Sequence, residues 1–123
     1  MRNQIVKTFK ALSDSHRLQI LALLKRQPLF VCEISQLLGL AFSTTSQHLA
    51  ILREAELIED FKEGRWVKYA RVKDFENPFI QQILNLVDEW ISVTPHYNID
   101  LKMLNKICGT RRSNFLKHIS SVD

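Results

Sequence analysis

The chain has 123 residues, which indicates one domain, and 46% of them are hydrophobic, with only three glycines and three prolines. This composition excludes a disordered chain and favours an ordered, helix-rich fold. No apolar run reaches the roughly 20 residues that span a bilayer. The polar N-terminus also lacks a signal-type apolar segment. We therefore expect a cytoplasmic protein with no membrane contact.

The formal net charge of +4 arises at the two ends of the chain. Residues 1–27 carry six Lys or Arg against one acid, and residues 100–123 carry five against two. Residues 41–71 are balanced at five against five. Net charge alone is therefore weak support for a nucleic-acid partner, and the order of the secondary-structure elements has to decide.

The first half of the chain predicts four short helices, because its apolar residues recur at spacings of three and four. Asp14 and its two serine neighbours supply N-cap oxygens for the second helix. Pro28 ends that helix, since proline disfavours helix in the residue before it. Gly39 fits the left-handed cap of the third helix. We expect the four helices over about residues 3–12, 15–25, 31–38 and 43–54.

The pattern changes to β-branched and aromatic residues after the fourth helix. The runs Leu57–Phe61 and Trp66–Val72 flank a turn that contains Gly64, which predicts a β-hairpin. Pro78 then opens a long helix to about Ile91, a favourable position for proline in the first turn. A last short helix is expected over residues 100–108 and should stop at Gly109, before a polar tail.

This order predicts a mainly α fold with a β-hairpin: a winged helix-turn-helix of about five core helices plus a short C-terminal helix. We expect residues 1–93 to form the DNA-binding and dimerisation domain and residues 94–123 a C-terminal extension. The helix after Pro78 is apolar on more than one stripe, so it needs cover from the core and from a partner chain. We therefore expect a dimer whose interface includes Ile5, Phe9, Phe79, Ile83, Val87 and Trp90.

The fourth helix has the character of a recognition helix. Thr45, Leu49 and Leu52 should face the core, which turns the polar side chains of the first turn outward. Gln47 can offer a paired donor and acceptor to adenine, and first-turn amides favour phosphate. The alternative is an ordinary polar helix start capped by Ser43. The residues that we expect at DNA from this helix are Ser43, Thr44, Ser46, Gln47, His48 and Arg53.

The hairpin strengthens the DNA-binding interpretation. Lys62 and Arg65 flank Gly64 at the tip, where cations can contact phosphate or enter the minor groove. Hairpin tips are often charged simply because they are solvated, but a recognition helix followed by a cationic wing is far less common by chance. Trp66 and Tyr69 are interpreted as packing residues of the hairpin rather than base-stacking platforms.

With these residues in view, the chain resembles the ArsR-type winged-helix repressors over roughly residues 4–91. The resemblance is carried by FKALSDSHRLQILALL, by VCEISQLLGLAFSTTSQHLAILREAELI and by FKEGRWVKYARV. It implies a homodimer joined through the first and last long helices. It also implies binding to a pseudo-palindromic operator in double-stranded DNA, and release by a metal, a metalloid or thiol oxidation.

The chain departs from the family pattern at the sites for DNA and for the inducer. Glu56 stands where the family usually has glycine, and Ala41 stands at the usual hydroxyl N-cap position. Arsenic-responsive relatives carry Cys-Val-Cys-Asp-Leu in the third helix, but here Phe30 replaces the first cysteine. Asp88 and His96 do not supply the pattern of zinc-sensing relatives, so we predict no zinc site in the last long helix.

Two interpretations of the two cysteines are open. Cys32 and Cys108 could form a two-thiol sensor that closes around trivalent arsenic or a soft metal ion, or oxidises to a disulfide. Alternatively, Cys32 is a small buried apolar side chain and Cys108 an incidental thiol. The chain would then be a winged-helix regulator without metal sensing.

Two other classes of function compete with DNA binding. A winged helix can serve as a protein-interaction module, which the balanced charge of residues 41–71 permits. An enzyme is not expected, because no nucleophile–base pair is present. The four histidines also show no short metal-ligand spacing with one another.

Overall fold

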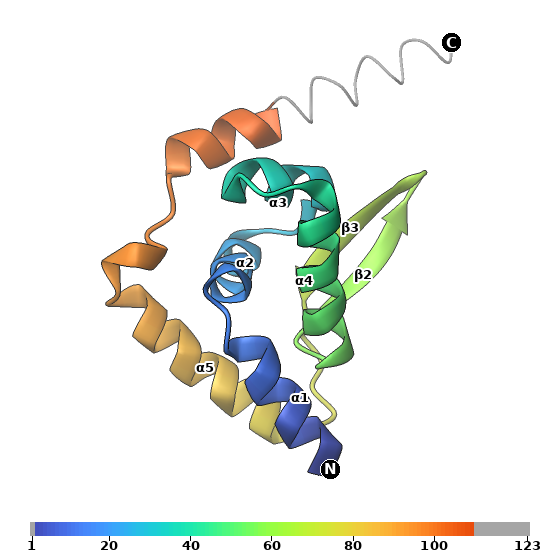
Figure 1. The fold of residues 1–123 in the computed structure, drawn as a ribbon, viewed down its shortest axis with the longest axis vertical. Helices are drawn as coiled ribbons and strands as arrows, with labels where there is room; N and C mark the ends of the chain where they lie inside the picture. The colour runs from blue at the N-terminus through green and yellow to red at the C-terminus, as the bar shows by residue number, and fades with distance from the viewer. Residues whose placement is uncertain (1, 110–123) are drawn as a thin grey trace.

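The predicted helices and hairpin strands follow one another in the expected order, with the short strand β1 and a 3₁₀ turn in addition (Figure 1). The computed structural model describes residues 2–109, and the predicted polar tail beyond them lies outside the described residues. A short 3₁₀ turn and a further helical segment over residues 101–109 follow the last long helix. The elements are α1 (Arg2–Leu12), α2 (Ser15–Arg26), β1 (Leu29–Phe30), α3 (Val31–Leu38), α4 (Phe42–Glu54), β2 (Ile58–Glu63), β3 (Trp66–Arg71), α5 (Pro78–Ser92) and η1 (Pro95–Tyr97).

Local chemistry sets the helix ends as predicted in three places. The carboxylate of Asp14 accepts hydrogen bonds from the backbone amides of His16 and Arg17, at 2.8 and 3.2 Å, and so caps α2. Gly39 ends α3 in the left-handed region with φ 66°. At α5, Asn77 caps the helix and Pro78 occupies the first turn.

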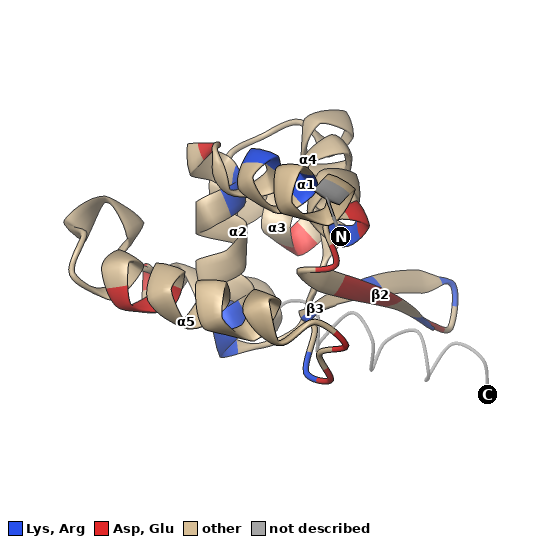
Figure 2. Cartoon of the chain, turned by 90° about the horizontal axis from the view of Figure 1, so that it is seen from below, with Lys and Arg blue, Asp and Glu red and all other residues tan. Residues whose placement is uncertain are grey.

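The wing belongs to a three-stranded antiparallel sheet with the order β1-β3-β2. The two-residue strand β1 was not predicted, because it is too short to show an alternating pattern. Its residues Leu29 and Phe30 are buried and pair with Tyr69 and Lys68 of β3. This pairing holds the base of the hairpin against the helices, while its tip projects from them (Figure 2).

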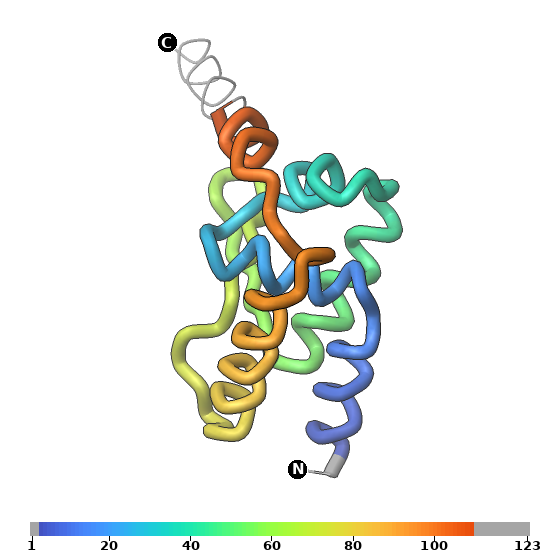
Figure 3. The backbone as a smooth tube through the Cα atoms, turned by 90° about the vertical axis from the view of Figure 1, so that its left-hand side faces the viewer, coloured from blue at the N-terminus to red at the C-terminus, as the bar shows by residue number. Residues whose placement is uncertain are grey.

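The core is built around α2, against which the other elements pack. Its residues Ile20, Leu21 and Leu24 are buried together with one face of α4 and with the inner face of α5. Leu104 of the segment 101–109 is also buried in this core, so the segment packs on the domain beside α3 (Figures 1 and 3). The division of the chain into a domain over residues 1–93 and a C-terminal extension over residues 94–123 stays a prediction.

One predicted boundary is wrong, and one stays a prediction. Gly109 is helical and is the last described residue, so the predicted stop at Gly109 lies at the edge of the described residues. The helix α4 begins at Phe42, one residue earlier than predicted, because Ala41 occupies the N-cap position.

None of the described helices is both long and apolar enough to cross a bilayer.

Glu56 has φ 65°, the one residue other than glycine with positive φ among those described. Its amide donates to Arg53 O at 2.9 Å, and the next amide donates to Leu52 O at 3.1 Å, which closes α4. A side chain in this left-handed region costs on the order of 1 kcal/mol relative to glycine. Glu56 in place of the glycine usual in the family therefore strains the backbone at this position.

We predict that Glu56→Gly raises the free energy of unfolding by about 1 kcal/mol, because it removes this strain. Urea denaturation of the two proteins measures the difference. Gly39→Ala is the matched control: its site has positive φ and no atom within 4 Å of an added Cβ, so it should lose a similar amount. An unchanged or lower stability of Glu56→Gly would contradict this account.

Candidate nucleic-acid interface

The inward face of α4 is the one that the sequence predicts. Thr45, Leu49 and Leu52 are fully buried. Ser43 and Gln47 are exposed, Thr44 and Ser46 are half-buried, and all four lie in the N-terminal half of the helix. Packing therefore leaves one polar surface at the start of α4, where a recognition helix would meet DNA.

The first turn of α4 lacks a side-chain cap. Ala41 offers only its carbonyl oxygen, which accepts hydrogen bonds at 3.0 Å from both the backbone amide and the hydroxyl of Thr45. The alternative that Ser43 caps this helix is wrong, because Ser43 already lies inside it. No acidic residue occurs in the first turn. The turn therefore keeps free amides and a positive dipole end suited to phosphate.

Phe42 is an apolar residue of this surface that the sequence reasoning missed. It opens α4 and its side chain is 60% exposed. An apolar side chain beside the start of a recognition helix could contact a thymine methyl group. Its position just before the polar run Ser43–Gln47 was the signal available in the sequence.

The wing ends in a two-residue turn between Glu63 and Trp66. Gly64 has φ 65° while Arg65 does not have positive φ, the arrangement in which glycine takes the first position of a type II′ turn. Lys62 and Arg65 are exposed, and neither forms an ion pair with another described residue. Figure 2 shows basic residues at the projecting tip of the hairpin and acidic residues along β2.

The aromatic residues of the hairpin make packing contacts. The Trp66 ring lies 6.0 Å from the Phe30 ring, and Lys68 Nζ lies 5.3 Å from the centre of the same Phe30 ring. Tyr69 is half-buried, and burial raises the pKa of its hydroxyl. These contacts join the wing to β1 and support the interpretation of Trp66 and Tyr69 as packing residues.

Arg53 and His48 differ from the other residues of α4 that are predicted to contact DNA, because both have contacts within the protein. Arg53 pairs with Asp60 of β2 at 2.9 Å, so it stiffens the junction between α4 and the wing. His48 is half-buried, its Nδ1 lies 3.1 Å from Arg17 Nη1, and burial lowers the pKa of its ring. Their contacts with DNA stay predictions.

Exposed apolar residues gather on α1 and α5. The predicted interface residues Ile83 and Val87 are half-buried, and the other four are exposed, with Trp90 exposed by 72%. Both helices reach the same end of the molecule (Figures 1 and 3). Further large apolar residues exposed on these helices, which were not predicted, are Val6 and Leu86.

Both cysteines are half-buried thiols. Cys32 lies in the first turn of α3. Cys108 lies in the segment 101–109, and its Sγ accepts a hydrogen bond from Gln27 Nε2 at 2.8 Å. The fold thus brings the segment that holds Cys108 back to the end of α2, close to the start of α3 (Figure 1).

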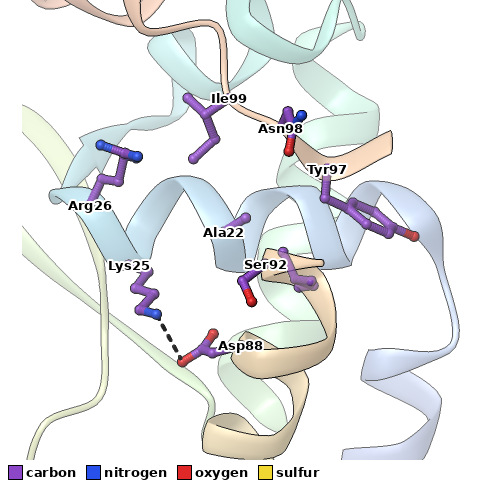
Figure 4. A pocket seen from close by; sticks show the side chains of 9 residues that line it. Ala22, Lys25, Arg26, Asp88, Ser92, Tyr97, Asn98 and Ile99 are labelled. Carbon is purple, nitrogen blue, oxygen red and sulfur yellow. Dashed lines mark ion pairs between the residues drawn. The ribbon is translucent and has the colours of Figure 1, made fainter. Parts of the chain in front are cut away.

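An open cavity of about 380 Å³ lies between α2, the end of α5 and the segment that follows it (Figure 4). One wall carries the ion pair of Lys25 with Asp88, whose atoms lie 4.0 Å apart. Because cations and an anion face the same space, the cavity has no single charge preference. Its lining residues are Ala22, Lys25, Arg26, Asp88, Ile91, Ser92, Tyr97, Asn98 and Ile99.

Comparison with known proteins agrees with this geometry. The model of the family "Bacterial regulatory protein, arsR family" matches residues 14–60. The arsenic resistance transcriptional regulator ArsR1 of Pseudomonas putida is 34% identical over 88 residues, which cover 68% of this chain and 69% of that protein. The transcriptional repressor SdpR of Bacillus subtilis is 32% identical over 81 residues, 66% of this chain and 90% of that protein.

Among solved structures, the homodimeric winged helix-turn-helix DNA-binding domain Mb0332 of Mycobacterium bovis superposes with a TM-score of 0.60 and 27% identity. The match covers 78% of this chain and 89% of that one. The fold and the outward face of α4 thus define a winged-helix transcriptional regulator, which confirms the predicted fold class. The chain belongs to the ArsR family, as its resemblance indicated. Because its relatives are regulators, the prediction that it is not an enzyme is confirmed.

Proposed function

We propose that this chain is a homodimeric transcriptional repressor that binds a pseudo-palindromic operator. The N-terminal half of α4 enters the major groove, and the wing contacts the adjacent backbone. The observation that carries the proposal is the orientation of α4: its buried face leaves Ser43 and Gln47 exposed beside uncapped first-turn amides. Helix amides and hydroxyls position the protein on phosphates, and Gln47 reads a base edge.

The wing adds the electrostatic part of binding. Lys62 and Arg65 project at its tip without acidic partners among the described residues. Each cation placed at a phosphate releases counterions, so binding weakens as salt is added. The exposed ring of Phe42 favours a second candidate, a protein-interaction module, which would lack this salt dependence.

The proposed dimer buries the apolar faces of α1 and α5. Four of the six predicted interface residues are exposed in the single chain, and apolar side chains exposed together in this way mark an interaction surface. The M. bovis relative, described as homodimeric, supports the same arrangement. Two recognition helices would then lie one helical turn of DNA, or a multiple, apart.

We further propose that Cys32 and Cys108 form the switch. The donor set fits a two-thiol site: α3 offers a single thiol because Phe30 occupies the other cysteine position, and the folded-back segment 101–109 offers a second. Trivalent arsenic would bind two thiolates, and an oxidant would convert the two thiols to a disulfide with loss of two electrons and two protons. The similarity to an arsenic resistance regulator supports trivalent arsenic as the bound species.

For DNA binding, we predict that Gln47→Ala makes the binding free energy for a selected duplex less favourable by about 1–3 kcal/mol. The variant should also discriminate less between DNA sequences. Arg65→Ala should weaken binding to all duplexes and reduce the salt slope by about one per recognition site. Duplexes selected from a random pool and fluorescence anisotropy at several salt concentrations measure both effects.

Lys102→Ala is the matched control for charge, because Lys102 is an exposed cation of the segment 101–109 and not part of the hairpin. It should leave the salt slope unchanged. If Gln47→Ala and Arg65→Ala bind as the parent does, the DNA surface lies elsewhere. Binding that ignores salt would favour the protein-interaction module.

For the dimer, we predict that Trp90→Glu weakens self-association by on the order of 30-fold or more, because it buries a charge in an apolar interface. Sedimentation equilibrium should show a shift toward the 14.4 kDa single chain. Phe61→Glu is the control, because Phe61 is also an exposed aromatic residue but lies in β2 of the wing. This variant should keep the dimer. A Trp90→Glu dimer as tight as the parent would place the interface on another face.

For the switch, we predict that trivalent arsenic or the oxidant diamide releases the reduced protein from DNA. Cys32→Ser and Cys108→Ser should each keep DNA binding and lose the release, because one thiol can neither chelate nor form the disulfide. Anisotropy combined with intact mass follows both events. Reduced protein that takes up one equivalent of arsenic and stays on DNA would end the sensor proposal.

A further inference from the structure

The fold brings together three side chains whose spacing in the sequence shows no metal-ligand pattern. Asp14 and His16 stand at the start of α2, and His48 projects from α4. One potential ligand atom of each lies within 4.8 Å of those of the other two. The rings of His16 and His48 have their centroids 5.7 Å apart and are tilted by 52°. All three side chains are half-buried.

We infer that Asp14, His16 and His48 form a binding site for a divalent transition-metal ion such as Zn²⁺, Co²⁺ or Ni²⁺. Two imidazole nitrogens and one carboxylate oxygen are ligands that these ions accept, with water in the open position. A tetrahedral ion with bonds of about 2.0–2.1 Å holds its ligand atoms roughly 3.4 Å apart. Small side-chain rotations are enough to close the observed cluster to that spacing.

The surroundings of the cluster favour the anionic form of Asp14 and the neutral form of His48, which are the forms that bind a metal ion. Burial opposes the charge of Asp14, but the amide hydrogen bonds of Arg17 and His16 and the Arg17 cation hold its pKa below the ordinary value. The carboxylate accepts those bonds through Oδ1, so Oδ2 is available to an ion. The same partial burial favours the neutral ring of His48, which is the metal-binding form.

Arg17 faces the cluster and must respond when an ion binds. Its Nη1 donates to His48 Nδ1 at 3.1 Å. An ion that takes Nδ1 replaces this contact, and an ion that takes Nε2 leaves the proton on Nδ1, which then cannot accept. Arg17 keeps its hydrogen bonds to Ala11 O and Lys10 O, at 2.8 and 2.9 Å, in either case. The ion would thus replace Arg17 as the link between α2 and the recognition helix.

The test is a Co²⁺ titration of the full chain in the reduced state, followed by visible d–d absorption. We expect one equivalent per chain, displaced by Zn²⁺. His16→Gln, His48→Gln and Asp14→Asn should each weaken Co²⁺ binding by at least about tenfold, since loss of an outer-shell partner alone costs that much. Asp14→Asn keeps a capping oxygen for α2, and the His16 ring donates no hydrogen bond among the described residues, so both variants should fold.

The controls separate this site from the other possible ligands. His96→Asn removes an exposed histidine whose Nε2 lies 3.2 Å from Ser15 Oγ, outside the cluster, and should bind Co²⁺ as the parent does. A spectrum with thiolate charge transfer that is lost in Cys32→Ser or Cys108→Ser would overturn the inference. So would absorption that survives both His16→Gln and His48→Gln, or no absorption at all. Since the readout needs no DNA, its failure is distinct from a failure of the proposed repressor function.

Discussion

The ion pair of Arg71 with Asp88 fixes the two outward surfaces of the molecule relative to each other. Both side chains are largely buried, 14% and 13% exposed, and the guanidinium meets the carboxylate through two hydrogen bonds of 2.8 and 2.9 Å. Arg71 Nη1 also donates to Leu21 O at 3.2 Å. Strand β3 of the wing, helix α5 and helix α2 are therefore joined at one point. Loss of one partner would leave a buried charge unpaired, which typically costs 3–5 kcal/mol, about a third or more of a small domain's stability.

A second set of contacts joins α1 to the recognition helix. Gln4 Nε2 donates to Ala55 O at 2.8 Å, just past the end of α4, and Arg17 bonds the last carbonyls of α1 as well as His48. Helix α1, which carries part of the proposed dimer surface, therefore holds the C-terminal end of the recognition helix directly and is joined to its middle through Arg17 of α2. In the proposed dimer, the two sets of contacts together would make the spacing of the two recognition helices depend on the dimer interface.

The sequence predicts the fold where local chemistry decides the conformation. The buried stripe of α4, the turn at Gly39 and the strain at Glu56 follow from apolar spacing and from the cost of positive φ. Strand β1 was missed because two residues exist as a strand only through their partners in β3. The start of α4 was misplaced because no side chain at Ala41 marks it. The cluster of Asp14, His16 and His48 could not be predicted, since it depends on how α2 and α4 cross and not on spacing along the chain.

Arg17 connects these observations, because it is the polar side chain that touches three helices at once. It closes α1 through two carbonyls, lies in the first turn of α2 and donates to the ring of His48 on α4. His48 follows Gln47, the side chain proposed to read a base, so any group that competes with Arg17 for the imidazole acts directly behind the reading surface. A neutral ring accepts from Arg17, whereas a metal-bound ring cannot. The position of α4 on the core is thus set by apolar burial, by the contacts of its C-terminal end with α1, and by an exchangeable hydrogen bond at His48.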